Sequence, residues 1–169
     1  MSSSPIQGAG FAAAQAAADA ARLVATVARE TDGWPRAAGV AAQATALADR
    51  LDELAREDAE AFAAALAALE ASSGDLTIRM DRAAEVPLEI TRTAADVCET
   101  AALVAERCDG VLRADAAGAA ALASGAAVAT AHLVRANLVV SPDDPRLVQA
   151  LRAVDDARFW TKRALDAGA

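Results

Sequence analysis

Apolar residues recur every three or four positions along most of the chain, which is the spacing of one face of an α-helix. The pattern is interrupted where turn-forming residues cluster, at Asp32-Gly33-Trp34-Pro35, Ser72-Ser73-Gly74 and Asp109-Gly110. It therefore predicts five helices, at about residues 11–30, 36–71, 76–108, 115–140 and 146–165.

Proline residues modify two of these helices. Pro87 lies inside the predicted third helix, and we expect a kink or a break there because proline lacks an amide donor and clashes with the preceding turn. The segment Ser141-Pro142-Asp143-Asp144 has the pattern of a capping residue followed by proline and acid, which predicts the start of the fifth helix.

Composition agrees with a helical fold. Alanine, the best helix former, supplies 52 of the 169 residues, whereas tyrosine is absent and only three Phe and two Trp occur. We predict an all-α fold, a bundle of about five long helices, with residues 1–169 forming a single domain. Its core is expected to consist of Leu, Val and Ala at close helix–helix approach.

The charge balance narrows the class of partner. The formal net charge of −8 favours solubility and argues against nucleic acid or an anionic membrane as the main partner. The uncharged, alanine-rich stretch at residues 116–131 is shorter than the ~20 residues that span a bilayer. The first residues also lack the basic start and strongly apolar run of a signal peptide. These features predict a cytoplasmic protein that does not cross a membrane.

Cysteine and histidine are too few for a metal centre. Cys98 and Cys108 lie ten positions apart in one predicted helix, about 15 Å along its axis, which is too far for a disulfide within that helix. We interpret both as reduced thiols that act as small apolar residues. With a single histidine, His132, no clustered metal-ligand spacing occurs, and no metal is expected.

One carboxylate interrupts an apolar stripe. In the predicted second helix, position 58 belongs to this stripe and is aspartate; its other members are Leu47, Leu51, Leu54, Phe62, Ala65 and Leu69. A carboxylate on an apolar face is costly unless it is paired or hydrogen-bonded. Asp58 is thus either a partly exposed or ion-paired structural residue, or a carboxylate of a functional site.

Small residues mark one face of the predicted fourth helix. Gly118, Gly125 and His132 recur every seven residues, and glycines at this spacing suggest close contact with another helix, as at a dimer interface. His132 is then better explained as an interface or core residue than as a general base. In the third helix, residues 82–92 carry Arg and Glu at ion-pair spacings, which a solvated face explains.

Four segments resemble one enzyme family, in that family's order. LAREDAEAF at 54–62, AAEVPLEI at 83–90, ADAAGAAAL at 114–122 and VRANL at 134–138 together span most of the chain. They are similar to the cyclodeaminase domain of formiminotransferase-cyclodeaminase and to the bacterial methenyltetrahydrofolate cyclohydrolases of the same family. The resemblance implies a helical bundle that acts on one-carbon derivatives of tetrahydrofolate.

The chain departs from the family pattern at three hydroxyl positions. The family has a Pro-Thr-Pro-Gly-Gly-Gly-Ser loop before its first alanine-rich helix, where this chain has PIQGAGF at residues 5–11. Gly8 and Gly10 remain, whereas Ile6 and Phe11 replace the threonine and the serine. Ala114 stands where the family has the serine before its aspartate.

The implied reaction is cyclodeamination of 5-formiminotetrahydrofolate with release of ammonia, or the related opening of the methenyl bridge by water. Neither needs a metal or a cofactor besides the folate substrate. On this basis Asp58 and Asp115 are candidate proton-transfer groups. Arg135 and Asn137 are candidates for binding the glutamate tail and the pterin.

The glycine-rich turn at Gly8 and Gly10 completes the implied substrate site. Asp115 and Asn137 are about 33 Å apart in a continuous helix, so a homodimer with sites shared between subunits is expected. A separate formiminotransferase is the natural partner. Instead of a role in proton transfer, Asp115 can have a purely structural one, as the N-cap of the fourth helix. For the chain as a whole, the alternative is a non-catalytic assembly or regulatory domain of the same fold.

Overall fold

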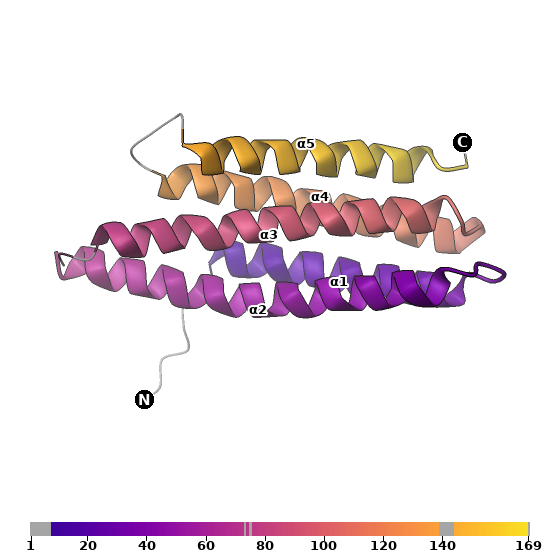
Figure 1. Cartoon of the computed structure of the whole chain (residues 1–169), viewed down its shortest axis with the longest axis horizontal. Coiled ribbons are helices and arrows are strands. Elements are labelled where there is room, and N and C mark those ends of the chain that lie inside the picture. The colour runs from indigo at the N-terminus through magenta and orange to yellow at the C-terminus, as the bar shows by residue number, and fades with distance from the viewer. Residues whose placement is uncertain (1–7, 73, 75, 139–143, 169) are drawn as a thin grey trace.

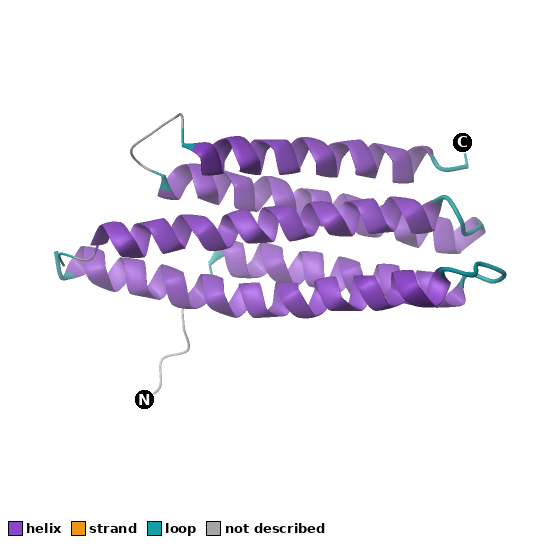
Figure 2. Cartoon of the chain, viewed as in Figure 1, coloured by secondary structure: helices purple, strands orange, loops and turns teal. Residues whose placement is uncertain are grey.

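The computed structural model describes residues 8–72, 74, 76–138 and 144–168, which form five long helices (Figure 1). In chain order they are α1 (Ala9–Glu30), α2 (Ala37–Glu70), α3 (Leu76–Ala105), α4 (Gly110–Asn137) and α5 (Pro145–Asp166). No strand occurs among the described residues (Figure 2). The predicted all-α bundle of five helices is confirmed.

The helices lie side by side along one common axis, and each runs antiparallel to the one before it (Figure 1). Helices α1, α2, α3 and α4 form a four-helix ring, because each contacts the next and α4 contacts α1. Helix α5 packs against α3 and α4 outside this ring. This order brings the start of α1, the middle of α2, the first half of α3 and the end of α4 to one region of the bundle.

The core is built mainly from alanine. Most side chains with no exposed surface are alanines, and the largest fully buried apolar side chains are Leu51, Leu54 and Ile90. Small side chains allow helix axes to approach closely, as the composition predicted. Cys98 and Cys108 are buried and unpaired, in agreement with their interpretation as reduced, apolar-like thiols.

Helix α2 is longer than its partner α1. At 34 residues it measures about 51 Å, against about 33 Å for the 22 residues of α1. The large apolar residues of this α2 stripe are therefore buried only along its first part: Leu51 and Leu54 are fully buried, whereas Phe62 and Leu69 are 43% and 59% exposed. The small Ala65 between Phe62 and Leu69 is buried. Asp58 lies where the cover by α1 ends.

Several helix ends differ from the sequence-based expectation. Helix α4 begins at Gly110 after Asp109, so the predicted start at 115 is wrong and Asp115 is not its N-cap. Helix α3 ends at Ala105 rather than at 108. Helix α5 begins at Pro145 with Asp144 as N-cap, whose carboxylate accepts a 2.8 Å hydrogen bond from the backbone N–H of Arg146.

The capping segment predicted before the fifth helix also included residues 141–143, which lie outside the described residues. Of the kink or break expected at Pro87, the break is wrong, because α3 is helical from Leu76 to Ala105 without interruption; a kink stays a prediction. The side chain of Asn137 on α4 donates a hydrogen bond to the carbonyl of Ala83, which this proline leaves without its helical partner.

Helix α4 is long and apolar enough to pass as a membrane span by length and hydropathy alone. It packs against α1, α3 and α5, however, and core helices of soluble bundles pass the same test. Gly118, Gly125 and His132 lie on its exposed face, and among the described residues no other part of the chain comes within 4 Å of a Cβ added at either glycine. The predicted close packing of this face stays a prediction that concerns a second chain.

Candidate functional site

Four helices meet at a small pocket that contains four of the six predicted site residues. Asp58 on α2 and Asn137 on α4 line it together with the glycine-rich start of α1. The pocket has a volume of about 140 Å³, and its lining residues are Gly8, Ala9, Gly10, Asp58, Phe62, Ala83, Leu133 and Asn137. We call it the Asp58 pocket.

The carboxylate of Asp58 lies directly against the first turn of α1. It accepts a hydrogen bond from the backbone N–H of Phe11, and the residue is only 8% exposed. Gly10 makes this approach possible, since a Cβ at that position would lie 2.4 Å from both carboxylate oxygens. The N-cap residue Gly8 has no side chain to bind the free amides of α1, so Asp58 supplies that carboxylate from α2.

Burial raises the pKa of Asp58 above the ordinary value of an aspartate, although the hydrogen bond from Phe11 opposes the shift. A carboxyl group with a raised pKa holds a proton more readily and is a stronger base when ionised. Proton transfer is most efficient when the pKa of the group lies near the working pH. The environment of Asp58 therefore moves it toward general acid–base chemistry.

Asn137 is the last residue of α4, and its side chain crosses to α3. Its Nδ2 donates a 2.5 Å hydrogen bond to the backbone carbonyl of Ala83. Because a carbonyl oxygen can only accept, this bond fixes which half of the amide faces α3. Asn137 also lines the Asp58 pocket.

The other two predicted residues lie elsewhere. Asp115 is exposed in the second turn of α4, about 33 Å along the helix from Asn137. Arg135 is exposed and lines a separate groove between α4 and α5, together with His132 and Arg158. Neither residue belongs to the Asp58 pocket of the same chain.

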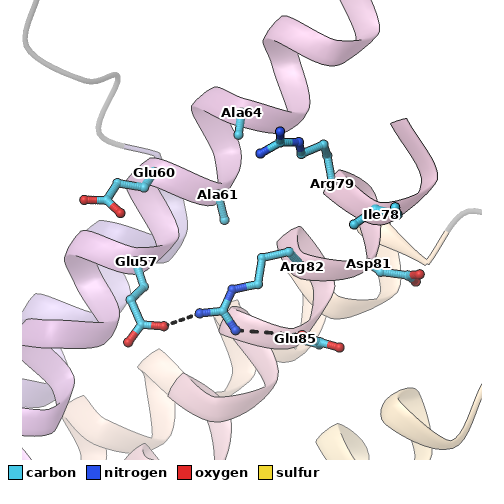
Figure 3. A pocket seen from close by; sticks show the side chains of 9 residues that line it. All are labelled: Glu57, Glu60, Ala61, Ala64, Ile78, Arg79, Asp81, Arg82 and Glu85. Atoms are coloured by element: carbon cyan, nitrogen blue, oxygen red, sulfur yellow. Dashed lines mark hydrogen bonds and ion pairs between the residues drawn. The ribbon is translucent and has the colours of Figure 1, made fainter. Parts of the chain in front are cut away.

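A larger hollow of about 860 Å³ lies between α2 and α3 (Figure 3). Its lining includes four acidic and two basic side chains, and Arg82 bridges Glu57 and Glu85 across it (Figure 3). An excess of carboxylates makes this groove a poor site for an anionic ligand. Asp58 does not line it.

Two backbone groups that bind the side chains of the pocket are not among the site residues predicted from the sequence. The N–H of Phe11 binds Asp58, and the carbonyl of Ala83 binds Asn137. The second had a sequence signal, because a proline four residues later removes the helical partner of that carbonyl. Within the described residues no group of three or more potential ligands is arranged to hold a metal ion.

Comparison with known proteins agrees with the resemblance found in the sequence. Residues 1–156 match the family described as formiminotransferase-cyclodeaminase. The fold is similar to the crystal structure of formiminotetrahydrofolate cyclodeaminase from Thermotoga maritima, with a TM-score of 0.80 and 23% sequence identity over 96% of this chain and 88% of that one. Among curated proteins no sequence matches. Since the match covers nearly the whole chain, this protein belongs to the formiminotransferase-cyclodeaminase family, as a cyclodeaminase-type domain.

Proposed function

We propose that this chain binds a tetrahydrofolate derivative at the Asp58 pocket and catalyses the cyclodeamination of 5-formiminotetrahydrofolate. The observation that carries the proposal is the buried carboxylate of Asp58, with its raised pKa, set beside the Asn137 amide in a chain of this family. Opening of the methenyl bridge by water requires the same kind of proton transfer, so cyclohydrolase activity is the second reaction that the pocket supports.

Asp58 serves as a proton relay in this scheme. N10 of the folate bonds to the carbon of the protonated formimino group, N5–CH=NH₂⁺, and this carbon becomes tetrahedral and carries an amino group, –NH₂. The ionised Asp58 accepts the proton that N10 releases and donates it to this amino nitrogen. The bond between carbon and the amino nitrogen then breaks, ammonia leaves, and the methenyl bridge remains. Asp58 returns to its ionised form.

The other residues of the pocket bind and orient the substrate. The Oδ1 atom of Asn137 accepts a hydrogen bond from an N–H group of the pterin. Gly8 lets the ligand approach the backbone at the start of α1, because no other described residue lies within 4 Å of a Cβ built there, and Gly10 leaves room for the Asp58 carboxylate to meet the ligand at this place. Each role follows from the position of the residue around the pocket.

The size of the pocket favours a site completed by a second copy of the chain. A volume of about 140 Å³ is well below the ~300–1,000 Å³ that enclose a drug-sized ligand, and a folate is of that size. We propose an antiparallel homodimer that brings Asp115 of one copy to the end of the other copy's α4, where Arg135 and Asn137 lie. Asp115 would share the proton transfer, and Arg135 would neutralise the glutamate tail.

The proposed substrate implies a partner enzyme. Its formimino group has to be transferred to tetrahydrofolate before cyclodeamination, so we propose a separate formiminotransferase as functional partner. The net charge of −8 and the two unpaired thiols fit a cytoplasmic location, which we propose as well.

A non-catalytic assembly or regulatory role is the second candidate, and one observation favours it. The contact between Asp58 and the N–H of Phe11 stabilises the start of α1 without any ligand, so a structural role alone accounts for this carboxylate. Phe11 also packs its side chain against the core, where the family pattern has a serine.

Isothermal titration calorimetry with 5-formyltetrahydrofolate, a stable analogue, distinguishes the two candidates. We expect a micromolar Kd and about one site per chain for the wild-type protein. Release of ammonia from 5-formiminotetrahydrofolate should fall by about 10²–10⁴-fold in Asp58→Asn. The matched control is Asp49→Asn, an exposed position on the same helix, which should leave turnover unchanged. No binding at millimolar ligand would favour the non-catalytic role.

A further inference from the structure

Pro87 leaves one carbonyl of α3 without its helical partner. In an α-helix the N–H of residue 87 would donate to the carbonyl of Ala83, and proline has no N–H. The proline ring also crowds that carbonyl and turns it away from the helix axis. A buried carbonyl without a donor is costly, so a donor from outside the helix is required.

Asn137 supplies that donor from α4, at 2.5 Å from the Ala83 oxygen. A second polar contact joins the same two helices about two turns away, where the buried hydroxyls of Thr91 and Thr130 lie 2.8 Å apart. The Thr91 hydroxyl in turn donates to the carbonyl of Pro87 itself, also at 2.8 Å. These contacts set the register of α3 against α4 around the proline.

The consequence reaches the Asp58 pocket, which both Ala83 and Asn137 line and Pro87 does not. We propose that Pro87 is a positioning residue: it keeps the carbonyl of Ala83 open so that Asn137 binds there and presents its Oδ1 to the ligand. This inference rests on the proposed folate site for its functional part. Its structural part, the coupling of Pro87 to the Asn137 amide, can be tested without a ligand.

The Pro87→Ala substitution separates positioning from stability. An alanine restores the helical N–H and removes the ring, so the carbonyl of Ala83 bonds within α3 and its contact with Asn137 weakens. The helix itself becomes more stable, since proline is the least favourable residue in a helix interior. We therefore expect a higher melting temperature together with an affinity for 5-formyltetrahydrofolate that is about three- to tenfold lower.

Asn137 is the only asparagine of the chain, which provides a direct readout. After labelling of asparagine side chains with ¹⁵N, a single NH₂ group is visible by NMR. In the wild-type protein we expect one downfield, slowly exchanging proton, and in Pro87→Ala both protons near the values of a free amide. Pro145→Ala, at the exposed first position of α5, is the matched control and should leave the signal unchanged.

A double-mutant cycle completes the test. If Pro87 acts through Asn137, then Pro87→Ala changes the affinity in the wild-type background and has no further effect in Asn137→Ala. An unchanged amide signal in Pro87→Ala overturns the inference, whether or not the wild-type protein binds folate. A changed signal with unchanged affinity in a wild-type protein that does bind folate overturns its functional part. Absence of wild-type binding would instead contradict the proposed function.

Discussion

Gly10 and Asp58 form the contact on which the Asp58 pocket depends, and replacing the glycine with alanine tests it directly. The added Cβ would lie 2.4 Å from both oxygens of the carboxylate, far inside contact distance. Asp58 must then turn away from the start of α1 and lose the hydrogen bond from Phe11. The substitution thus removes one interaction while it leaves the charge of Asp58 in place.

The net cost is the difference between two opposing effects. A hydrogen bond to a charged group contributes about 1.5–3 kcal/mol. Alanine in place of glycine stabilises a helix by about 0.5–1 kcal/mol. Gly10→Ala should therefore lower the free energy of unfolding by about 0.5–2.5 kcal/mol. For a chain of this size that corresponds to a melting temperature lower by about 1–10 °C.

Gly39→Ala is the matched control. Gly39 also lies in the first turn of a helix, α2, but it is exposed and nothing lies within 4 Å of its added Cβ. Thermal and urea unfolding followed by circular dichroism should show this variant to be as stable as the wild type or more stable. If Gly10→Ala is stabilised to the same degree as Gly39→Ala, Asp58 is not held against α1 and the reasoning is refuted.

Three further predictions concern titration, thiols and the second copy. Because the folded pKa of Asp58 is raised, the folded chain keeps a proton that the unfolded chain has lost, so stability falls as pH rises from the unfolded pKa through the folded one. Asp58→Asn should flatten this part of the pH dependence in urea unfolding; curves of equal slope would contradict it. Burial raises the pKa of Cys98 to about 11 and also raises that of Cys108, so a thiol reagent near neutral pH should label neither until the chain unfolds, and rapid native labelling would disprove this. Asp115→Asn should lower turnover with an unchanged circular dichroism spectrum if a dimer completes the site, whereas full turnover would remove Asp115 from the mechanism.

Much of the fold was predictable because its signals are local. The three-and-four spacing of apolar residues and the turn-forming residues between them gave all five helices. The errors are at helix ends, where competing local signals are nearly balanced. The dipeptide Asp109-Gly110 predicts the end of the third helix, but in the structure it marks the start of the fourth. Asp109 is extended, and Gly110 is the first residue of α4. The same dipeptide pattern serves both purposes.

Four residues that line the candidate site could be named from the sequence, but their meeting at one pocket could not be predicted from it. Asp58 is identifiable in the sequence because it interrupts an apolar stripe. The family resemblance identifies the other three, Gly8, Gly10 and Asn137. Their meeting depends on how α1, α2, α3 and α4 align, and helix register is set by packing between distant segments. Asp115 and Arg135 matched the same family segments, yet the single chain places them away from the Asp58 pocket.

The alanine core reverses the usual mutational sensitivity of a folded domain. Truncating a large core side chain typically costs about 2–5 kcal/mol, but most fully buried positions here have only a methyl group to lose. Enlargement is the damaging change, because a leucine at Ala21 or Ala120 has to separate helices that are already in contact, at a cost of about 1–3 kcal/mol or more. Replacement of a buried alanine by a larger apolar residue, usually regarded as conservative, should therefore destabilise this bundle.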